Sequence, residues 1–346
     1  MHRLITFRNQ PVIAIPDAPK ALSLIAIRRY QPATMKKLLF QLGLRVAVVL
    51  HFDQCIGSLI KNPLNFIAGF DFEKWLEYIS LEIGEKCIYA TVVWPSPSDR
   101  GRIYVHLMDY KGRQLAFVKI SLDQLNDRML RNENATIKCL YAQKLKFSCQ
   151  PKILSWGQFC GYTYLALEPL PESARPIQLS RDELTNIIRE YSGTAHTIPK
   201  TDIQDIDWWS AFCEFAVSAP EFMETMKMAI SQGMKVCRVH GDLGPHNMVR
   251  EDRRLWLFDW EHSSKNGPCH TDELSMWLSA NQKLILRAPL RAVKRFADKY
   301  LNQNSSEYSN GIIAALGYLA MTQVLSAQII IAHWQHLHCP SELKLP

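Results

Sequence analysis

The stretch HGDLGPHNMVREDRRLWLFDWEHS, residues 240–263, decides how the rest of the chain is interpreted. Two short apolar runs, residues 248–249 and 255–258, flank the charged segment 251–254. Large apolar residues favour strands and charged or polar residues favour turns, so this pattern predicts a tight β-hairpin.

The predicted hairpin would bring two oxygen-bearing side chains together. Asn247 precedes the first arm and Asp259 follows the second, and paired strands lie roughly 5 Å apart, so one cation would touch both. Mg²⁺ suits this arrangement, because it prefers hard oxygen ligands and takes only one or two carboxylates from protein. Asp242 lies five positions before Asn247 in a loop with Gly and Pro, where it is free to face a substrate. An isolated Asp there would be a turn former, but the spacing of the three residues favours a site.

Two motifs bracket the hairpin, His-Gly-Asp-Leu at 240–243 and Asp-Trp-Glu at 259–261. In this order they resemble the catalytic loop and the metal-binding aspartate of the aminoglycoside phosphotransferase and choline kinase superfamily. The resemblance implies a bilobal protein-kinase-like fold of the α+β class, with a small antiparallel β-rich N-lobe and a larger helical C-lobe. It also implies that Asp242 is the catalytic residue and that Asn247 and Asp259 hold Mg²⁺.

Two further residues of this region are expected to support the site. His240 is expected to hold backbone in the loop rather than to take part in the chemistry. The resemblance also implies that Asp272, near the start of a later helix, braces the catalytic loop, although an aspartate there equally caps a helix.

The N-lobe is expected at residues 86–168, where the hydrophobic period becomes that of strands. Residues 87–94, 102–108 and 114–120 predict three strands of an antiparallel sheet. In a kinase-like enzyme the connection 95–101 would cover the nucleotide phosphates, and Ser96 and Ser98 would offer hydroxyl groups to them. The usual glycine-rich signature is absent from this connection.

Lys119 ends a Leu-Ala-Phe-Val-Lys-Ile run that resembles the strand whose lysine holds the α- and β-phosphates in kinases. The helix expected at 122–146 places Glu133 within an apolar stripe formed by Leu125, Met129, Ile137 and Leu140. A carboxylate that faces a core is costly unless a cation meets it, so Lys119 is the expected partner of Glu133. The alternative is that Glu133 reaches water at the helix edge.

A short hairpin around residues 156–157 is expected next, formed by residues 153–154 and 162–167. The resemblance implies that the two lobes join here, and that the backbone from Ala166 to Glu168 faces the adenine ring.

The C-lobe is expected at residues 169–346 and is predicted to be helical. Two Ser-x-x-Glu sequences predict capping boxes that open helices, Ser180 with Glu183 and Ser218 with Glu221. The uncharged segment 311–332 is long enough to span a bilayer, but its polar residues and lack of flanking basic clusters favour a buried helix, so no transmembrane helix is expected.

Residues 1–85 are expected to form an N-terminal extension whose role the sequence does not reveal. The helical spacing of Met35, Leu38, Leu39 and Leu42 predicts that the extension is partly helical. The first 50 residues hold eight Lys or Arg against one acid, and the remaining 32 basic and 32 acidic residues cancel. Such a basic segment indicates either an anionic partner or an ordinary solvated face on an extra helical layer. No specific nucleic-acid motif is found.

The composition is that of a globular protein, with 346 residues, 47% of them hydrophobic and 21% charged. Nine cysteines without a Cys-x-x-Cys pair indicate reduced thiols in a cytoplasmic protein, without a disulfide or zinc framework.

The sequence therefore predicts an ATP- and Mg²⁺-dependent phosphotransferase that moves the γ-phosphoryl group to a small-molecule hydroxyl. Sugars, amino sugars, aminoglycosides and amino alcohols all remain open as acceptors, and the few acids after Asp272 favour a neutral sugar. The alternative is a non-catalytic nucleotide-binding protein that uses its basic N-terminus as a docking arm.

Overall fold

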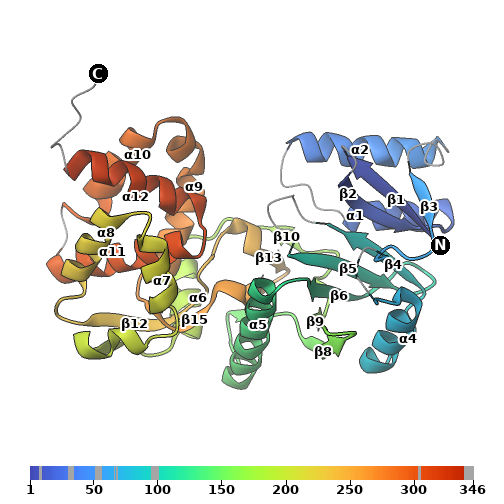
Figure 1. Cartoon of the computed structure of the whole chain (residues 1–346), viewed down its shortest axis with the longest axis horizontal. Coiled ribbons are helices and arrows are strands. Elements are labelled where there is room, and N and C mark those ends of the chain that lie inside the picture. The colour runs from blue at the N-terminus through green and yellow to red at the C-terminus, as the bar shows by residue number, and fades with distance from the viewer. Residues whose placement is uncertain are drawn as a thin grey trace. The chain divides into compact units, whose positions relative to one another are not determined.

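The computed structural model describes residues 1–7, 10–29, 35–50, 57–65, 67, 69–94, 101–302 and 305–338. The chain forms two compact units (Figure 1). The first unit comprises Met1–Ile137 and Pro151–Leu170, and the second comprises Lys138–Gln150 and Pro171–Pro346. The fold is α+β, as the sequence predicts, with a large antiparallel sheet in the first unit and mainly helices in the second.

The first unit is built on one sheet that has eight strands among the described residues, in the order β3-β1-β2-β4-β5-β6-β9-β8. Every pairing in this sheet is antiparallel. The strands are β1 His2–Phe7, β2 Gln10–Pro16, β3 Ser58–Ile60, β4 Tyr89–Val93, β5 Arg102–Met108, β6 Gln114–Ser121, β8 Ile153–Phe159 and β9 Tyr162–Leu167. The helices are α1 Lys20–Arg29, α2 Met35–Val49, α4 Phe72–Ile83 and α5 Gln124–Gln143, whose last residues belong to the second unit.

Both faces of the sheet are covered, because alternate strand residues point to opposite sides. Trp75 and Ile79 of α4 pack with Val92 and Val105 on one face. On the other face, Ile27 of α1 and two residues of α2 pack with Ile13 and Val93. The two faces thus form separate cores, one under α4 and one under the α1–α2 layer (Figure 1).

The N-terminal segment contains the expected helices and also three strands that the sequence analysis did not predict. Pro11 and Pro16 argue against strands in this segment, since Pro is rare inside sheets. In the structure Pro11 pairs with Thr6 where the β1–β2 register shifts, an irregularity that accommodates a missing N–H, and Pro16 ends its strand.

The second unit is mainly helical, with two small sheets, β10-β13-β14-β7 and β11-β12-β15. Its helices are α6 Arg181–Ser192, η2 Lys200–Asp205, α7 Trp209–Ala216, α8 Pro220–Ala229, η3 Pro245–Asn247, η4 Trp260–His262, α9 Thr271–Arg287, α10 Pro289–Tyr300, α11 Ser306–Met321 and α12 Leu325–His338. Its strands are β7 Ser148–Cys149, β10 Arg175–Pro176, β11 His196–Ile198, β12 Met234–Val239, β13 Met248–Glu251, β14 Arg254–Leu257 and β15 Ser264–Pro268. Phe212, Phe222 and Phe296 are fully buried in its core.

The apolar segment 311–332 belongs to two helices, α11 and α12, which are separated by Thr322–Val324 and contribute Leu319 and Ile330 to the core. Along the described residues, no helix combines the length and apolar character that crossing a membrane requires.

Two local predictions are wrong. Trp156 and Gly157 lie inside β8, and the turn to β9 is formed by Cys160 and Gly161, which both have positive φ. The second capping box is also absent, because Pro220 occupies the first turn of α8 and makes Ala219 the N-cap. The first box, Ser180 with Glu183, is confirmed.

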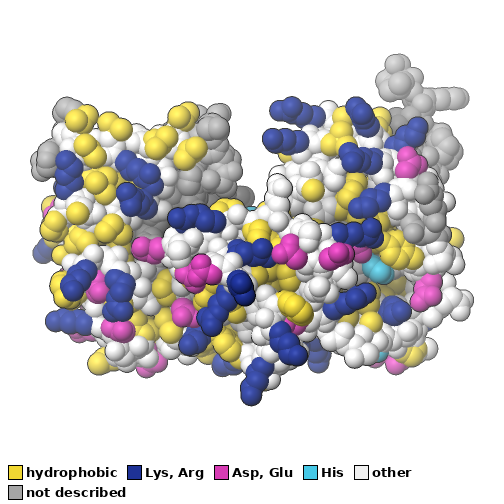
Figure 2. Space-filling model, turned by 180° about the vertical axis from the view of Figure 1, so that it is seen from behind, with side chains coloured by type: hydrophobic (Ala, Val, Ile, Leu, Met, Phe, Trp, Pro, Cys, Tyr) yellow, Lys and Arg dark blue, Asp and Glu magenta, His cyan; other side chains and the backbone are white. Residues whose placement is uncertain are grey.

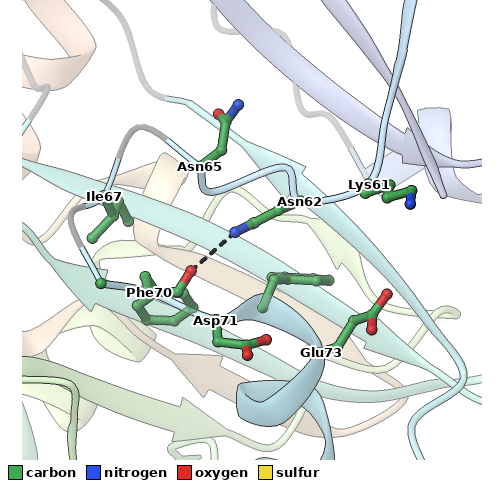
Figure 3. Close-up of a pocket in the computed structure, with 9 residues that line it drawn as sticks. Lys61, Asn62, Asn65, Ile67, Phe70, Asp71 and Glu73 are labelled. Atoms are coloured by element: carbon green, nitrogen blue, oxygen red, sulfur yellow. Dashed lines mark hydrogen bonds between the residues drawn. The ribbon is translucent and has the colours of Figure 1, made fainter.

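The first unit contains a pocket of about 470 Å³ lined by residues between Lys61 and Glu73 (Figure 3). Asn62 Nδ2 donates to the carbonyl oxygen of Phe70 at 2.9 Å and ties the two ends of the pocket wall together. None of the predicted site residues lines this pocket.

Candidate functional site

The predicted β-hairpin is confirmed in the second unit. Met248 pairs with Leu257 and Glu251 with Arg254, so the turn consists of residues 252–253 only. At the open end of the hairpin, the N–H of Phe258 donates to the carbonyl oxygen of Asn247 at 3.2 Å. Asn247 and Asp259 therefore lie within one residue of facing each other, as expected.

Asp242 and Asn247 are in direct contact. Asn247 Nδ2 donates to the carbonyl oxygen of Asp242 at 2.9 Å and to its Oδ2 at 3.1 Å. The amide nitrogen is thus committed to Asp242, which leaves Asn247 Oδ1 as the oxygen available to a cation. The Asp242 side chain is 28% exposed, so its carboxylate is both oriented by Asn247 and accessible to a substrate.

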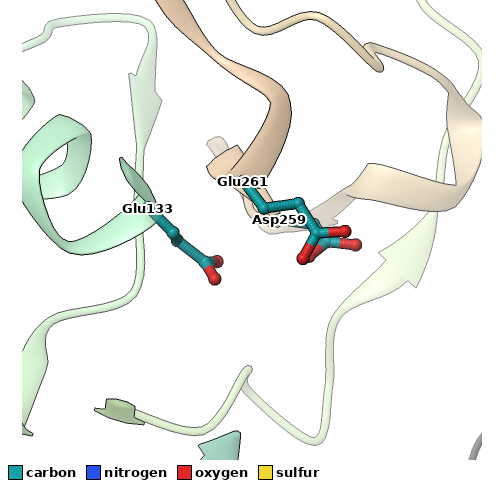
Figure 4. Close-up of side chains that lie close together, drawn as sticks. All are labelled: Glu133, Asp259 and Glu261. Carbon is teal, nitrogen blue, oxygen red and sulfur yellow. The ribbon is translucent and has the colours of Figure 1, made fainter. Parts of the chain in front are cut away.

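Asp259 occupies an unusual backbone conformation, with φ 69° and ψ 53° in the left-handed region. Residues other than glycine adopt this region infrequently, and such conformations occur often at functional sites. An oxygen of Asp259 lies within 4.8 Å of one from Glu261, which is buried (Figure 4). Together with Asn247 Oδ1, these carboxylates offer the hard oxygen donors that Mg²⁺ prefers.

Asp272, at the start of α9, holds the loop that carries Asp242. Its Oδ2 accepts from the N–H of His240 at 2.8 Å and its Oδ1 from the N–H of Gly241 at 3.0 Å. Tyr191 of α6 donates its hydroxyl to Oδ2 at 2.7 Å. Burial raises the pKa of Asp272, while these donors favour its charged form.

His240 is buried and contacts backbone on both sides. Its Nε2 lies 3.0 Å from the carbonyl oxygen of Phe258, and its Nδ1 is 3.4 Å from the N–H of Asp242. A neutral ring that carries its proton on Nε2 satisfies both contacts, and burial lowers the pKa of His240 accordingly. His240 therefore ties the loop to the end of β14.

Gly241 lies between these two anchors, with φ 84°. A Cβ at this position would overlap the carbonyl oxygen of His262. The close approach of the loop to the segment after the hairpin thus requires glycine.

Lys119 and Glu133 form a buried ion pair in the first unit. Lys119 Nζ lies 2.7 Å from Glu133 Oε2 and 3.0 Å from Oε1, and the side chains are 5% and 0% exposed. Glu133 thus points inward from α5, and the alternative in which it reaches water at the helix edge is wrong. The buried face of α5 does not include Leu125, which is 45% exposed.

The structure describes only some of the other residues that are predicted to contact the nucleotide. Ser96 and Ser98 lie outside the described residues. Ala166 is buried in β9 between Val118 of β6 and Ser155 of β8. Glu168 donates its N–H to the carbonyl oxygen of Lys152 at 2.7 Å, so this amide is already occupied.

Three residues near the site were not singled out from the sequence. The sequence indicates that Tyr191 belongs to an apolar helical stripe, and its position gives no signal of the contact with Asp272. The sequence indicates only a polar loop residue at His246, whereas in the structure its Nε2 lies 3.2 Å from Asp242 Oδ2, and this contact raises the pKa of His246. For Glu261, one sequence feature could have indicated a place in the site, namely its position in the Asp-Trp-Glu motif.

No protein-family model matches the chain, and no match was found among curated proteins. Among solved structures, the chain is similar to a protein assigned as a fructosamine-3-kinase from Haemophilus somnus 129PT, with 13% identity and a TM-score of 0.40 over 74% of this chain and 96% of that one. It is also similar to spectinomycin phosphotransferase in complex with ADP and spectinomycin, with 13% identity and a TM-score of 0.42 over 76% and 94% of the two chains. For a GDP complex of aminoglycoside 2'-phosphotransferase-IIIa, the identity is 10% and the TM-score 0.41 over 77% and 96%.

Proposed function

We propose that the protein is a cytoplasmic small-molecule kinase that transfers the γ-phosphoryl group of ATP to a hydroxyl group. The observation that carries this proposal is the arrangement in the second unit, where Asn247 orients the Asp242 carboxylate and also lies within one residue of facing Asp259 across the hairpin. Phosphoryl transfer asks a protein mainly for positioning and charge neutralisation, which such an arrangement supplies.

Each residue has a defined part in the proposed reaction. Asp242 orients the acceptor hydroxyl and accepts its proton, and its contact with Asn247 keeps the carboxylate in place. Asn247 Oδ1 and Asp259 would hold Mg²⁺, which neutralises charge on the phosphates when bound. Asp272 and His240 keep the loop backbone fixed while the proton moves.

The nucleotide is assigned to Lys119. Its ammonium group, positioned by Glu133 at 2.7 Å, would bind the α- and β-phosphates. The backbone from Ala166 to Glu168 is proposed to face the adenine, with the Glu168 carbonyl oxygen as one acceptor. The acceptor molecule is proposed to be neutral, such as a sugar hydroxyl.

The proposal is tested by ATP turnover with Mg²⁺ against sugars, amino sugars, aminoglycosides and amino alcohols. Asp242→Asn should lower kcat on the best acceptor by about 10²-fold or more, because the proton acceptor is lost. Asp252→Asn, in the exposed turn of the same hairpin, is the matched control and should leave turnover unchanged. Nucleotide binding without turnover on any acceptor would instead identify a non-catalytic nucleotide-binding protein, and equal activity of Asp242→Asn and wild type would remove Asp242 from the reaction.

A further inference from the structure

The outward side of α2, Met35–Val49, is apolar and exposed in the first unit. We call the five residues on this side the α2 face, and their exposed fractions range from 44% to 62%: Leu39, Leu42, Val46, Val49 and, just after the helix, Leu50. Their spacing follows the helical period, so they form one continuous stripe. A helix at the surface of a globular protein normally presents polar residues on this side.

The α2 face is not required by the core of the first unit. The opposite side of the helix already buries Leu44 and Val48 against Ile27 of α1. Gln41 also faces inward, and its Nε2 donates to the carbonyl oxygen of Ile27 at 3.0 Å. The helix is therefore apolar on both sides, one side packed and one side facing solvent.

The segment that carries α1 and α2 is basic. Residues 20–50 contain six basic residues, Lys20, Arg28, Arg29, Lys36, Lys37 and Arg45, and no acid. Lys20 donates to the carbonyl oxygen of Val49 at 2.6 Å, which places one ammonium group at the C-terminal end of α2. Hydrophobic and basic side chains lie together over this part of the first unit at the upper left of Figure 2.

We propose that the α2 face docks on an anionic lipid surface, with α2 lying in the plane of the membrane interface. An apolar stripe within a basic segment is the combination that interfacial helices use, and each basic residue near an anionic surface adds attraction. A second copy of this chain is a poorer occupant, because residues 20–50 carry six basic residues and no acid and would repel the same segment of another copy. This inference does not depend on the proposed phosphotransferase activity.

The test is co-sedimentation of the full chain with phosphatidylcholine vesicles that contain or lack phosphatidylserine. Wild type should bind the phosphatidylserine vesicles, and binding should weaken as the salt concentration rises. The double variant Leu39→Gln, Val46→Gln should weaken binding at least about tenfold, because two side chains that would enter the apolar part of the membrane interface become polar. Leu81→Gln is the matched control, because Leu81 is 82% exposed on α4 of the same unit.

Three results would overturn the proposal. Wild type could fail to bind phosphatidylserine vesicles, or the double variant could bind them as tightly as wild type. In the third result, wild type is a dimer in size-exclusion chromatography, the double variant is a monomer, and wild type does not bind lipid. That result would assign the α2 face to a second copy of the chain. The unfolding midpoint of each variant, compared with wild type, shows that the fold is retained.

Discussion

At the scale of single residues, the site depends on carboxylates that are held by hydrogen-bond donors. Asp272 is buried and accepts two backbone N–H groups and the Tyr191 hydroxyl, so its position fixes the loop that presents Asp242. Glu133 is buried as well, but its partner is the ammonium group of Lys119. Buried charges persist only with such partners, because their removal from water is costly.

The Lys119–Glu133 pair gives the first prediction. Glu133→Gln should lower the free energy of unfolding by about 3–5 kcal/mol, because the buried ammonium group loses its counter-charge. The double variant Lys119→Met, Glu133→Leu should recover most of that loss while still binding ATP poorly. Denaturant unfolding gives the stabilities and calorimetric titration gives the ATP affinity.

A stability unchanged by Glu133→Gln would contradict the burial of this pair. Normal ATP affinity in the double variant would contradict the role proposed for Lys119, whatever its stability. The two outcomes are therefore distinguishable.

His2 gives a pH-dependent prediction. Burial lowers the pKa of its ring from 6.5 to about 4. Its Nε2 lies 3.1 Å from the carbonyl oxygen of Ala90, and no partner for its buried Nδ1 is found among the described residues. The folded state thus binds fewer protons than the unfolded state, so the stability is fully present above about pH 6.5 and falls as the pH is lowered towards about 4.

The expected loss over this range is about 3 kcal/mol, since one pKa unit corresponds to 1.36 kcal/mol. The measurement is the free energy of unfolding between about pH 7 and pH 4, for wild type and His2→Gln. The wild-type curve should fall more steeply, and parallel curves would show that His2 titrates normally in the folded chain.

At the scale of helices and strands, predictions succeed where they depend on residues close together in the sequence. The hairpin at 248–257 and the capping box at Ser180 depend on residues only a few positions apart, and both are confirmed. The Ser218 box fails for an equally local reason, because Pro220 sets the helix start one residue later than a Ser218 cap requires. A capping motif thus predicts a helix start only when the neighbouring residues permit the backbone conformation that the cap requires.

The two Ser-x-x-Glu sequences provide a matched pair for experiment. Ser180→Ala should lower the free energy of unfolding by about 1 kcal/mol, because the Ser180 hydroxyl accepts from the N–H of Glu183. Ser218→Ala should lower the free energy of unfolding by less than Ser180→Ala does. Ser218 caps no helix, and its hydroxyl donates to the carbonyl oxygen of Phe215 at 2.7 Å. Equal costs for the two variants in denaturant unfolding would show that the capping box does not stabilise α6.

Long-range features were harder to predict from the sequence. The spacing of Leu39 and Leu42 predicts a helix, and α2 is present, but nothing local shows that these residues face solvent. Likewise, the contact between Tyr191 and Asp272 joins residues 81 positions apart. The pairing of Lys119 with Glu133 was predictable because a carboxylate in an apolar stripe needs a nearby cation.

At the scale of the whole molecule, the two units carry different parts of the proposed function. Lys119 and Glu133 belong to the first unit, whereas Asp242, Asn247 and Asp259 belong to the second. A chain of two units need not unfold in a single transition, so ligand effects are best followed for each transition separately.

ATP and Mg²⁺ should each stabilise the folded chain. A ligand at about 100 times its Kd stabilises the state that binds it by about 2.7 kcal/mol. Lys119→Met should remove the stabilisation by ATP, and Asp259→Asn the stabilisation by Mg²⁺, while Asp252→Asn should retain both. Scanning calorimetry with and without EDTA measures these effects, and a Mg²⁺ effect that persists in Asp259→Asn would place the ion elsewhere.

The two-residue turn at 252–253 also constrains how this chain could vary. Asn247 and Asp259 lie at the open end of the hairpin, so residues added to both arms beside the turn would lengthen the ribbon and leave that end unchanged. Opposed pairs alternate between hydrogen-bonded and non-hydrogen-bonded, so the same turn is kept only when each arm gains two residues at a time. Distant relatives that keep the turn should therefore separate the equivalent asparagine and aspartate by intervals that differ in steps of four, and a search that allows for such intervals would find proteins that a fixed-length pattern overlooks.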